Sequence, residues 1–257
     1  MNSGLEGAAA NKGERIAKVL ARAGLCSRRE AERWIAAGRV AVDGSVLLSA
    51  ATNVGEESEI RVDGRALPAR ERARLFRYHK PKGLVTSHRD EKGRPTVFSA
   101  LPEGLPRLLS VGRLDIASEG LLLLTNDGEL KRRLETSGWL RRYRVRVHGA
   151  VDEKRLSSLA HGIAIDGIAY GPIAAHLERV QGSNAWLGAS LREGRNRELK
   201  RVFEHLGLTV TRLIRLSYGP FQLGNLGRGE LVEVPKKVLL EQLGGAATTP
   251  ADADHRR

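Results

Sequence analysis

The sequence predicts an α+β protein in which a small domain precedes a larger domain built on a mixed or antiparallel sheet. The chain has 257 residues, more than one small core requires. Residues 65–74 are polar, contain a proline and lack a regular period, which is typical of a linker. After this linker, short β-rich runs are joined by short turns and not by regular helical crossovers. These observations predict two domains, at residues 14–64 and 75–243.

The smaller domain is predicted to begin with two helices. Apolar residues recur at helical spacing from Ile16 to Ala23, and Gly24 follows as a residue suited to a left-handed C-terminal cap. Ser27 and Glu30 have the spacing of a capping box, which begins the second helix.

A β-hairpin is predicted directly after this helix pair. Val40 and Val42 alternate with other residues before Asp43-Gly44, a pair that favours a type I′ turn. Residues 1–13 and 244–257 lack periodicity, so both are expected to be disordered tails.

The larger domain is predicted to alternate strands with a few helices. Its β-rich runs lie at residues 75–79, 83–87, 108–112, 143–147, 168–178, 185–191, 209–217 and 230–234. Its helical segments lie at residues 128–136, 152–160, 196–206 and 235–243. Asn126 and Asp127 are expected to cap the first of these helices.

The charge of the chain predicts a polyanionic partner. Lys and Arg number 43 against 30 Asp and Glu, a formal net charge of +13. Residues 131–146 hold seven basic side chains and one acid, and residues 192–215 hold seven basic side chains and three acids. Such concentrations are typical of surfaces that face phosphates, so nucleic acid is the expected partner class.

Several other classes are disfavoured by composition. Cys26 is the only cysteine, which excludes an intrachain disulfide and a zinc site of several thiolates. The first fifteen residues lack an apolar leader segment, and the longest aliphatic run, Leu121 to Leu124, is too short to span a bilayer. We therefore expect a cytoplasmic protein with no membrane segment.

The helix pair and hairpin resemble the S4 RNA-binding domain. The pattern extends over residues 15–44, RIAKVLARAGLCSRREAERWIAAGRVAVDG. The resemblance implies that the basic side chains of this segment contact RNA; they are Arg15, Lys18, Arg22, Arg28, Arg29, Arg33 and Arg39. Trp34 lies on the apolar stripe and is expected to be a core aromatic.

The larger domain resembles the pseudouridine synthase family that acts on ribosomal RNA. The run GRLDIASEGLLLLTNDG at residues 112–128 has the form of the family's signature. Similar matches occur at HKPKGLVTS (79–87) with GRPTVF (93–98), at RYRV (142–145) and at REGRNRELKRVFEHLG (192–207). Within this family the chain is most similar to the B-type enzymes of the large ribosomal subunit. The implied activity is isomerisation of a single uridine to pseudouridine.

The resemblance implies that Asp115 is the catalytic carboxylate. In the family this aspartate acts on the sugar, either by adding at C1′ or by removing the 2′ proton, and the sequence leaves both routes open. Uracil leaves as a delocalised anion and rejoins through C5, so one carboxylate can suffice and no cofactor is implied. Without the motif, Asp115 would be read as an ordinary turn residue.

Other site residues follow from the same motifs. Lys200 occupies the position of the basic partner of the aspartate, where many relatives carry arginine, and Tyr143 that of the tyrosine that stacks on the target base. Arg113 is expected to fill the space left by the extruded uridine or to hold a phosphate. Arg195 and Arg197 are expected to bind RNA. Without the motifs, Lys200 would be a solvated helix lysine and Tyr143 a half-buried strand residue.

Two other functions remain possible at this stage. A non-catalytic S4-type RNA-binding or ribosome-assembly factor would explain the charge but not the intact GRLD turn. A DNA-binding regulator would need a recognition helix and a dimerising partner, and neither is apparent. A monomer is expected, and the sequence does not identify which uridine is modified.

Overall fold

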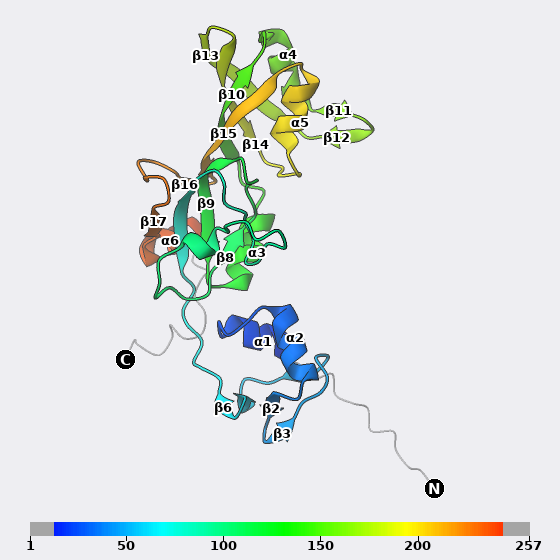
Figure 1. The fold of residues 1–257 in the computed structure, drawn as a ribbon, viewed down its shortest axis with the longest axis vertical. Coiled ribbons are helices and arrows are strands. Elements are labelled where there is room, and N and C mark those ends of the chain that lie inside the picture. The colour runs from blue at the N-terminus through cyan, green and yellow to red at the C-terminus, as the bar shows by residue number, and fades with distance from the viewer. Residues whose placement is uncertain (1–12, 244–257) are drawn as a thin grey trace. The chain divides into compact units, whose positions relative to one another are not determined.

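The computed structural model describes residues 13–243 and divides the chain into two compact units, with the boundary between Arg72 and Ala73 (Figure 1). The tails expected at residues 1–13 and 244–257 lie outside the described residues, apart from Gly13. Within residues 13–243, no helix is long and apolar enough to cross a membrane.

The first unit packs a helix pair against small sheets. Its elements are β1 (Glu14–Arg15), α1 (Ile16–Arg22), α2 (Arg28–Ala36), β2 (Val40–Val42), β3 (Ser45–Val46), β4 (Asn53–Val54), β5 (Ile60–Val62) and β6 (Arg65–Ala66). Strands β3, β2, β5 and β6 form one sheet in this order, and β1 pairs with β4. Ile16, Leu20, Ala31 and Ile35 are fully buried, so the apolar stripes of both helices form the core of the unit.

Local signals in the first unit produce the expected structures. The Ser27 side chain accepts a hydrogen bond from the backbone N–H of Glu30, which caps α2. Asp43 and Gly44 both have positive φ, as a type I′ turn requires. Asp63 and Gly64 repeat this geometry, so residues 65 and 66 return as strand β6. The linker is expected to begin at residue 65, but residues 65 and 66 belong to β6. The segment without regular structure is residues 67–74.

The second unit is built on a nine-stranded mixed sheet. Its main path runs β13-β14-β10-β15-β9-β7-β17, with β16 beside β15 and β8 beside β9. The strands of this sheet are β7 (Leu75–Lys80), β8 (Leu109–Val111), β9 (Glu119–Thr125), β10 (Arg141–His148), β13 (Ile173–Gln181), β14 (Asn184–Leu191), β15 (Thr209–Tyr218), β16 (Phe221–Gln222) and β17 (Leu231–Glu233). All neighbours are antiparallel except β9 and β15, so the predicted α+β class with a mixed sheet is confirmed.

The remaining elements of the unit are helices and one separate hairpin. They are η1 (Phe98–Ala100), α3 (Gly128–Thr136), α4 (Glu153–Ser158), η2 (Leu159–His161), β11 (Ile163–Ile165), β12 (Ile168–Tyr170), α5 (Glu198–His205) and α6 (Lys236–Leu243). The four predicted helices are present within two residues of their expected ends. Asp127 caps α3 by accepting hydrogen bonds from Glu129 and Leu130, whereas Asn126 instead accepts one from the backbone of Arg74.

The sheet consists of two halves that meet at β9 and β15. We call β13-β14-β10-β15 the outer half-sheet and β9-β7-β17 the inner half-sheet. Among the described residues, the register pairs between them are Ile214↔Glu119 and Arg215↔Gly120, and two side chains of β15 also bond β9: Arg212 pairs with Glu119, and Arg215 donates to the backbone oxygen of Leu121. A Cβ on Gly120 would lie 2.3 Å from the backbone oxygen of Arg215, so this close crossing requires glycine. The outer half-sheet packs with α4 and α5 on one hydrophobic cluster. The inner half-sheet packs with α3 and α6 on a second cluster, which also includes Ile214, Leu216 and Tyr218 from the end of β15.

Two predicted strands differ from the structure. Residues 168–178 form β12 and β13 separately, because Gly171-Pro172 interrupts the run and proline cannot donate to a strand ladder. Residues 83–87 form a loop with a single bridge between Val85 and Thr96.

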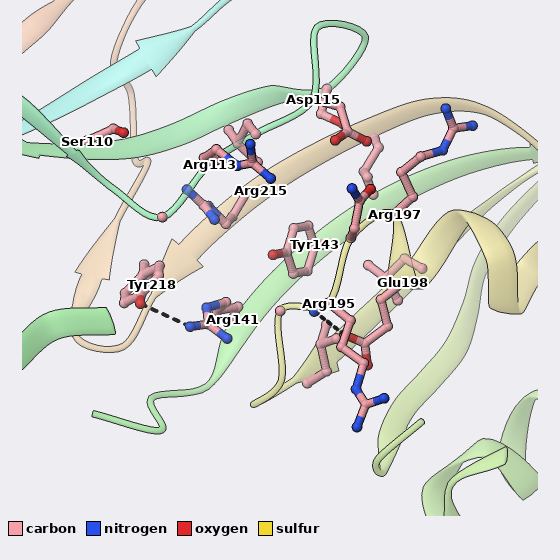
Figure 2. Close-up of a pocket in the computed structure, with 18 of the residues that line it drawn as sticks. Ser110, Arg113, Asp115, Arg141, Tyr143, Arg195, Arg197, Glu198, Arg215 and Tyr218 are labelled. Carbon is pink, nitrogen blue, oxygen red and sulfur yellow. Dashed lines mark hydrogen bonds between the residues drawn. The ribbon is translucent and has the colours of Figure 1, made fainter. Parts of the chain in front are cut away.

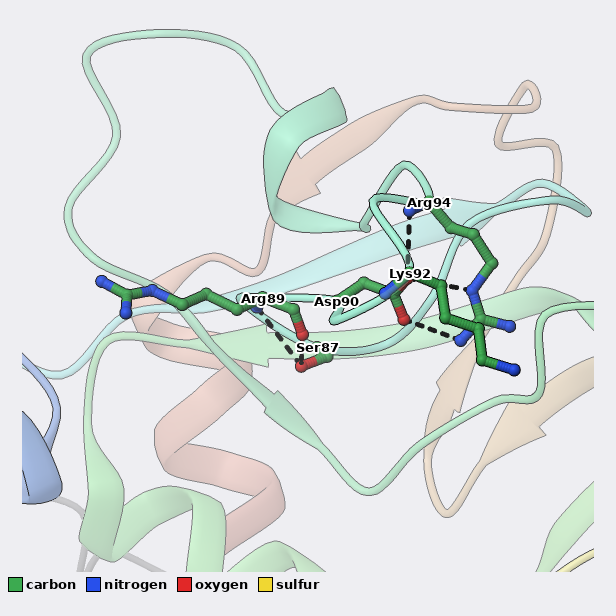
Figure 3. A network of polar contacts seen from close by, with 5 residues as sticks. All are labelled: Ser87, Arg89, Asp90, Lys92 and Arg94. Carbon is green, nitrogen blue, oxygen red and sulfur yellow. Dashed lines mark hydrogen bonds and ion pairs between the residues drawn. The ribbon is translucent and has the colours of Figure 1, made fainter.

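The same loop continues through residues 87–94, where hydrogen bonds between its own residues hold it in shape (Figure 3). Asp90 Oδ2 accepts hydrogen bonds from the backbone N–H groups of Lys92 and Arg94, and Oδ1 accepts one from the Arg94 guanidinium at 2.7 Å. These hydrogen bonds hold the pKa of Asp90 below its usual range. The side chain of Ser87 donates to the backbone oxygen of Arg89. The family-like segment at residues 93–98 is thus shaped by a turn and not by a strand.

Candidate active site

A cavity of about 450 Å³ lies where the two half-sheets meet (Figure 2). Its lining comes from the β8–β9 turn, from β10, from the loop before α5 and from β15. In the view of Figure 2, Arg113, Arg141 and Arg215 lie on one side of Tyr143, and Arg195 and Arg197 lie on the other. The volume is in the range of small-ligand pockets, and it is lined by several cations.

Asp115 lies at the tip of the β8–β9 turn and lines this cavity. The turn begins at Gly112, whose φ of +67° favours glycine, and it closes where the backbone N–H of Ser118 donates to the backbone oxygen of Asp115 at 3.0 Å. The side chain of Asp115 is 38% exposed. The carboxylate is therefore not sealed in the core and remains accessible to a substrate.

The buried amine of Lys80 holds the turn from behind. Its Nζ donates to the backbone oxygens of Pro81, Asp115 and Ser118 at 3.1, 3.1 and 2.9 Å. An ammonium has three N–H groups, so these three acceptors use all of them. Lys80 is fully buried, and this burial lowers its pKa to about 8.

The loop after β7 adds further support to the same turn. The Thr86 hydroxyl donates to the backbone oxygen of Leu114 at 2.7 Å, and the backbone N–H of Gly83 donates to that of Ile116 at 2.8 Å. The residues from 80 to 86 therefore fix the backbone on both sides of Asp115. This role explains why the segment expected as a strand at residues 83–87 leaves the sheet.

Lys200 lies beside the carboxylate, as the motif predicts. Its Nζ is 3.6 Å from Oδ2 of Asp115, and its side chain is 11% exposed. It projects from the first turn of α5, which begins after Arg197, a residue with φ of +55°. This position excludes the reading of Lys200 as a solvated helix lysine, while its catalytic importance stays a prediction.

The other residues expected at the site also line the cavity. Tyr143 is half-buried on β10 with its ring beside the outer hydrophobic cluster, a position that leaves stacking on a base possible. Arg113, Arg195 and Arg197 line the same cavity. Arg195 is 50% exposed and pairs with Glu193 at 3.1 Å.

Arg141, Arg215 and Glu198 are among the lining residues that were not predicted as site residues. Arg141 donates to the Tyr218 hydroxyl at 3.0 Å, and Arg215, which is 3% exposed, donates through Nε to the backbone oxygen of Leu121. Glu198 is 4% exposed, and burial raises its pKa. Arg215 Nη2 and Glu198 Oε1 have no hydrogen-bond partner among the described residues. Strand alternation offers a signal for Arg215, because it shares a face with the buried Leu213.

The basic residues of the first unit are mostly paired. Lys18 and Arg22 contact Glu14, Arg33 contacts Glu30, and Arg39 forms two hydrogen bonds with Asp63. Arg15 donates to the backbone oxygen of Ala51 at 2.6 Å. Arg28 and Arg29 are exposed and form no ion pair with any described residue. Arg39 also lies over the ring of the half-buried Trp34 at 4.7 Å.

No group of three or more His, Cys, Asp or Glu side chains within residues 13–243 is arranged to hold a metal ion. The cavity offers the accessible Asp115 carboxylate with an adjacent ammonium, surrounded by several guanidinium groups. A second carboxylate in the lining, Glu135, is engaged by Lys131 and by the backbone N–H of Gly112.

Comparison with known proteins gives matches for both units. Residues 14–60 match the S4 domain family, and residues 74–205 match the family described as RNA pseudouridylate synthase. An uncharacterized RNA pseudouridine synthase of Rickettsia prowazekii is 46% identical over 231 residues, which cover 89% of this chain and 97% of the relative. The ribosomal large subunit pseudouridine synthase B of Yersinia pestis is 40% identical over 264 residues, covering 95% of this chain and 82% of the relative.

One solved structure is similar along most of the chain. It is a crystal structure of a pseudouridylate synthase with 29% sequence identity and a TM-score of 0.62, and the match covers 89% of this chain and 99% of that one.

Proposed function

Because this chain belongs to the RNA pseudouridylate synthase family and carries an N-terminal S4 domain, we propose that it converts one uridine of large-subunit ribosomal RNA to pseudouridine at the cavity around Asp115. The observation that carries the proposal is the accessible Asp115 carboxylate with the Lys200 ammonium 3.6 Å away. The names of the relatives from Yersinia pestis and Salmonella typhi support the large subunit as the source of the RNA.

Asp115 acts on the ribose of the target uridine. The carboxylate either adds to C1′ or removes the 2′ proton, and uracil leaves as an anion whose charge is delocalised over the ring. The detached ring turns and forms a bond from C5 to C1′, which releases the carboxylate from C1′ or is accompanied by return of the 2′ proton. C5 then loses its proton and N1 takes one up, so the product is an isomer of the substrate. Tyr143 stacks on the ring and keeps it in the cavity while it is unattached. These steps involve no net oxidation or reduction, and no group from another molecule is transferred.

Lys200 and Lys80 support this carboxylate in different ways. RNA that closes the cavity removes water from Asp115, and the adjacent Lys200 charge compensates this loss of solvation. Lys80 bonds the backbone and not the carboxylate, so it fixes where the carboxylate points. Lys200 is thus an electrostatic partner and Lys80 a positioning residue.

The target uridine must leave its stack to reach Asp115. Unstacking costs a few kcal/mol, which phosphate contacts must offset. Arg113, Arg195 and Arg197, which line the cavity, make such contacts, and Arg28 and Arg29 of the S4 domain, which form no ion pair within residues 13–243, add positive charge. The proposed enzyme works as a monomer in the cytoplasm and needs no cofactor.

The decisive experiment is a map of pseudouridines in ribosomal RNA from cells lacking the protein. One site in the large-subunit RNA should be missing, and the wild-type protein should restore it. Asp115→Asn should fail to restore the site, whereas Asp166→Asn, a change in the exposed β11–β12 turn, should restore it fully. An unchanged map would refute the proposal. A ribosome-assembly defect without a missing site would instead support the non-catalytic alternative.

A further inference from the structure

The arginines of β10 lie on the face of the outer half-sheet that is opposite the cavity. Tyr143 lines the cavity, and Val145 and Val147 are buried in the cluster that contains Val202 and Phe203 of α5. Side chains alternate between the two faces of a strand, so Arg142, Arg144 and Arg146 project from the other face. The basic run at residues 131–146 therefore does not form one surface, and the proposed reaction does not use Arg142, Arg144 and Arg146.

No described helix covers this opposite face. Figure 1 shows α4, α5 and the β11–β12 hairpin on one side of the outer half-sheet, the side on which the hydrophobic cluster lies. An antiparallel sheet that is covered on one face leaves its other face exposed to solvent and available to a partner.

The exposed face is basic and its side chains are held in place. Trp186 on β14 lies beneath the guanidinium groups of Arg144 and Arg212, at 4.7 and 5.9 Å. Arg144 also pairs with Glu178 at 2.7 Å, and Arg212 pairs with Glu119 at 2.6 Å. These contacts restrict both side chains, which reduces the entropy lost on binding a ligand.

Two arginines on this face remain free to bind an anion. Arg142 and Arg146 form no ion pair with any described residue, and Arg142 is exposed. With the paired Arg144 between them, they form a row along β10 at intervals of about 7 Å. A guanidinium recognises phosphate oxygens with two parallel N–H groups, so such a row suits a run of successive phosphates.

We propose that Arg142, Arg144, Arg146, Arg212 and Trp186, here called the outer strip, form a second RNA-binding surface for a segment of the substrate RNA outside the cavity. The inference rests on the proposed function, because the RNA held at Asp115 supplies the second segment at a high effective concentration. The strip and the cavity lie on opposite faces of one half-sheet. An RNA must therefore pass round the sheet edge to reach both, and a short hairpin in the cavity would leave the strip empty.

The test compares a double variant of the strip with a matched control. Arg142→Gln with Arg146→Gln removes the two unpaired charges, and Lys154→Gln with Lys237→Gln removes two exposed charges from α4 and α6. The probes are a whole transcript of large-subunit ribosomal RNA and a short hairpin containing the modified uridine. Both are assayed for binding at several salt concentrations and for kcat/KM.

The strip variant should bind the whole transcript about tenfold more weakly than the control. Its salt dependence, the slope of log K against log [salt], should be less steep by about 1.4 to 1.8, because two phosphate contacts are lost at about 0.7 to 0.9 each. The ratio of kcat/KM for the transcript to that for the hairpin should fall by the same factor, and the control should keep the wild-type ratio. Arg142→Glu with Arg146→Glu should enlarge these effects, with circular dichroism confirming that each variant is folded.

Equal affinities of the glutamine variant and the control for the whole transcript would overturn the proposal. So would an equal loss on transcript and hairpin, because the strip would then act through the cavity and not through a separate segment. Failure of the proposed function has a different signature, since the wild-type protein would then form no pseudouridine. The binding comparison would still decide whether the strip contacts RNA.

Discussion

The basic side chains of the two units differ in where they lie. In the S4 unit most are on the surface, and several contact an acid within the same unit, as Arg33 does with Glu30 and Arg39 with Asp63. In the larger unit Lys80, Lys200 and Arg215 are buried around the cavity, with 0%, 9% and 3% exposure. Exposed charges act through a field that salt screens, and each contributes little. Buried charges fix the geometry of one site, so a single substitution among them should have a large effect.

The largest expected effect is at the carboxylate that the buried cations surround. Asp115→Ala should lower pseudouridine formation on ribosomal RNA by at least about 10³-fold, because no other described carboxylate pairs with Lys200. RNA affinity should stay within a few fold, because the exposed arginines are unchanged. Single-turnover assays and filter binding measure the two quantities. Full activity of Asp115→Ala would contradict the expectation that charged groups at the cavity have larger single effects than exposed arginines.

The second largest effect is expected at Lys80. Lys80→Met keeps the length of the side chain but leaves three backbone oxygens without their donor, so the turn should shift and kcat should fall about 10²-fold. Lys92→Met, a change of an exposed lysine in the same segment of the chain, is the control and should leave kcat unchanged. Equal kcat values for the two variants would show that the burial of a cation near Asp115 has no catalytic consequence.

Lys200 should show an intermediate effect. Lys200→Met removes the charge 3.6 Å from Asp115 and should lower kcat about tenfold with KM unchanged, a loss of about 1.4 kcal/mol of transition-state stabilisation. Lys200→Arg keeps the charge and should retain most of kcat. A raised KM with unchanged kcat would instead place Lys200 among the RNA-binding residues.

The pH dependence should distinguish Lys80 from every exposed lysine. Its pKa is lowered to about 8 by burial, so activity should fall severalfold as pH rises through about 8, when one of its three hydrogen bonds is lost. Stability should change in the opposite direction. Between pH 8 and 10.5 the unfolded chain binds more protons at Lys80 than the folded one, so the free energy of unfolding should rise with pH relative to Lys80→Met. Parallel pH profiles for wild type and Lys80→Met, in activity and in urea unfolding, would contradict this.

The smallest effect is expected for exposed arginines of the S4 unit. Arg28→Gln with Arg29→Gln should weaken RNA binding only a few fold and make its salt dependence less steep by about 1.4 to 1.8. Arg61→Gln with Arg65→Gln, on the β5–β6 hairpin of the same unit, is the matched control and should change neither quantity. A loss of kcat in the first variant would show that the S4 unit also shapes the catalytic site.

The sequence predicts most elements of the fold because their signals are local. The Ser27 cap, the Asp43-Gly44 turn and helix α3 each depend on a few neighbouring residues. The loop at residues 83–87 was wrongly predicted as a strand, because its alternation is that of a strand. The Gly83 backbone N–H and the Thr86 hydroxyl instead bond the Asp115 turn, which lies about thirty residues later in the chain.

Site residues were predictable where a sequence motif includes the functional side chain. They were harder to predict where a side chain acts through hydrogen bonds to distant backbone groups. Asp115, Lys200 and Tyr143 follow from the motifs, and the structure places all three at the cavity or its edge. Lys80 was missed because a lysine at a strand end is usually exposed. Its alternation with Phe76 and Tyr78 puts it on the buried face, but its three acceptors are carbonyls of distant residues that no local pattern reveals.

The narrow connection between β9 and β15 has a mechanical consequence. Asp115 lies on the turn that leads into β9 of the inner half-sheet, whereas Tyr143 lies on β10 of the outer half-sheet and Lys200 on α5, which packs on it. Among the described residues, β9 and β15 share two register pairs, one ion pair and one side-chain hydrogen bond to backbone. A nucleotide in the cavity therefore spans this joint and stiffens it, much as a crosslink would. Without substrate, warming should loosen this joint before the two cores unfold. Thermal inactivation of this enzyme would then precede its melting, and bound RNA would bring the two temperatures together.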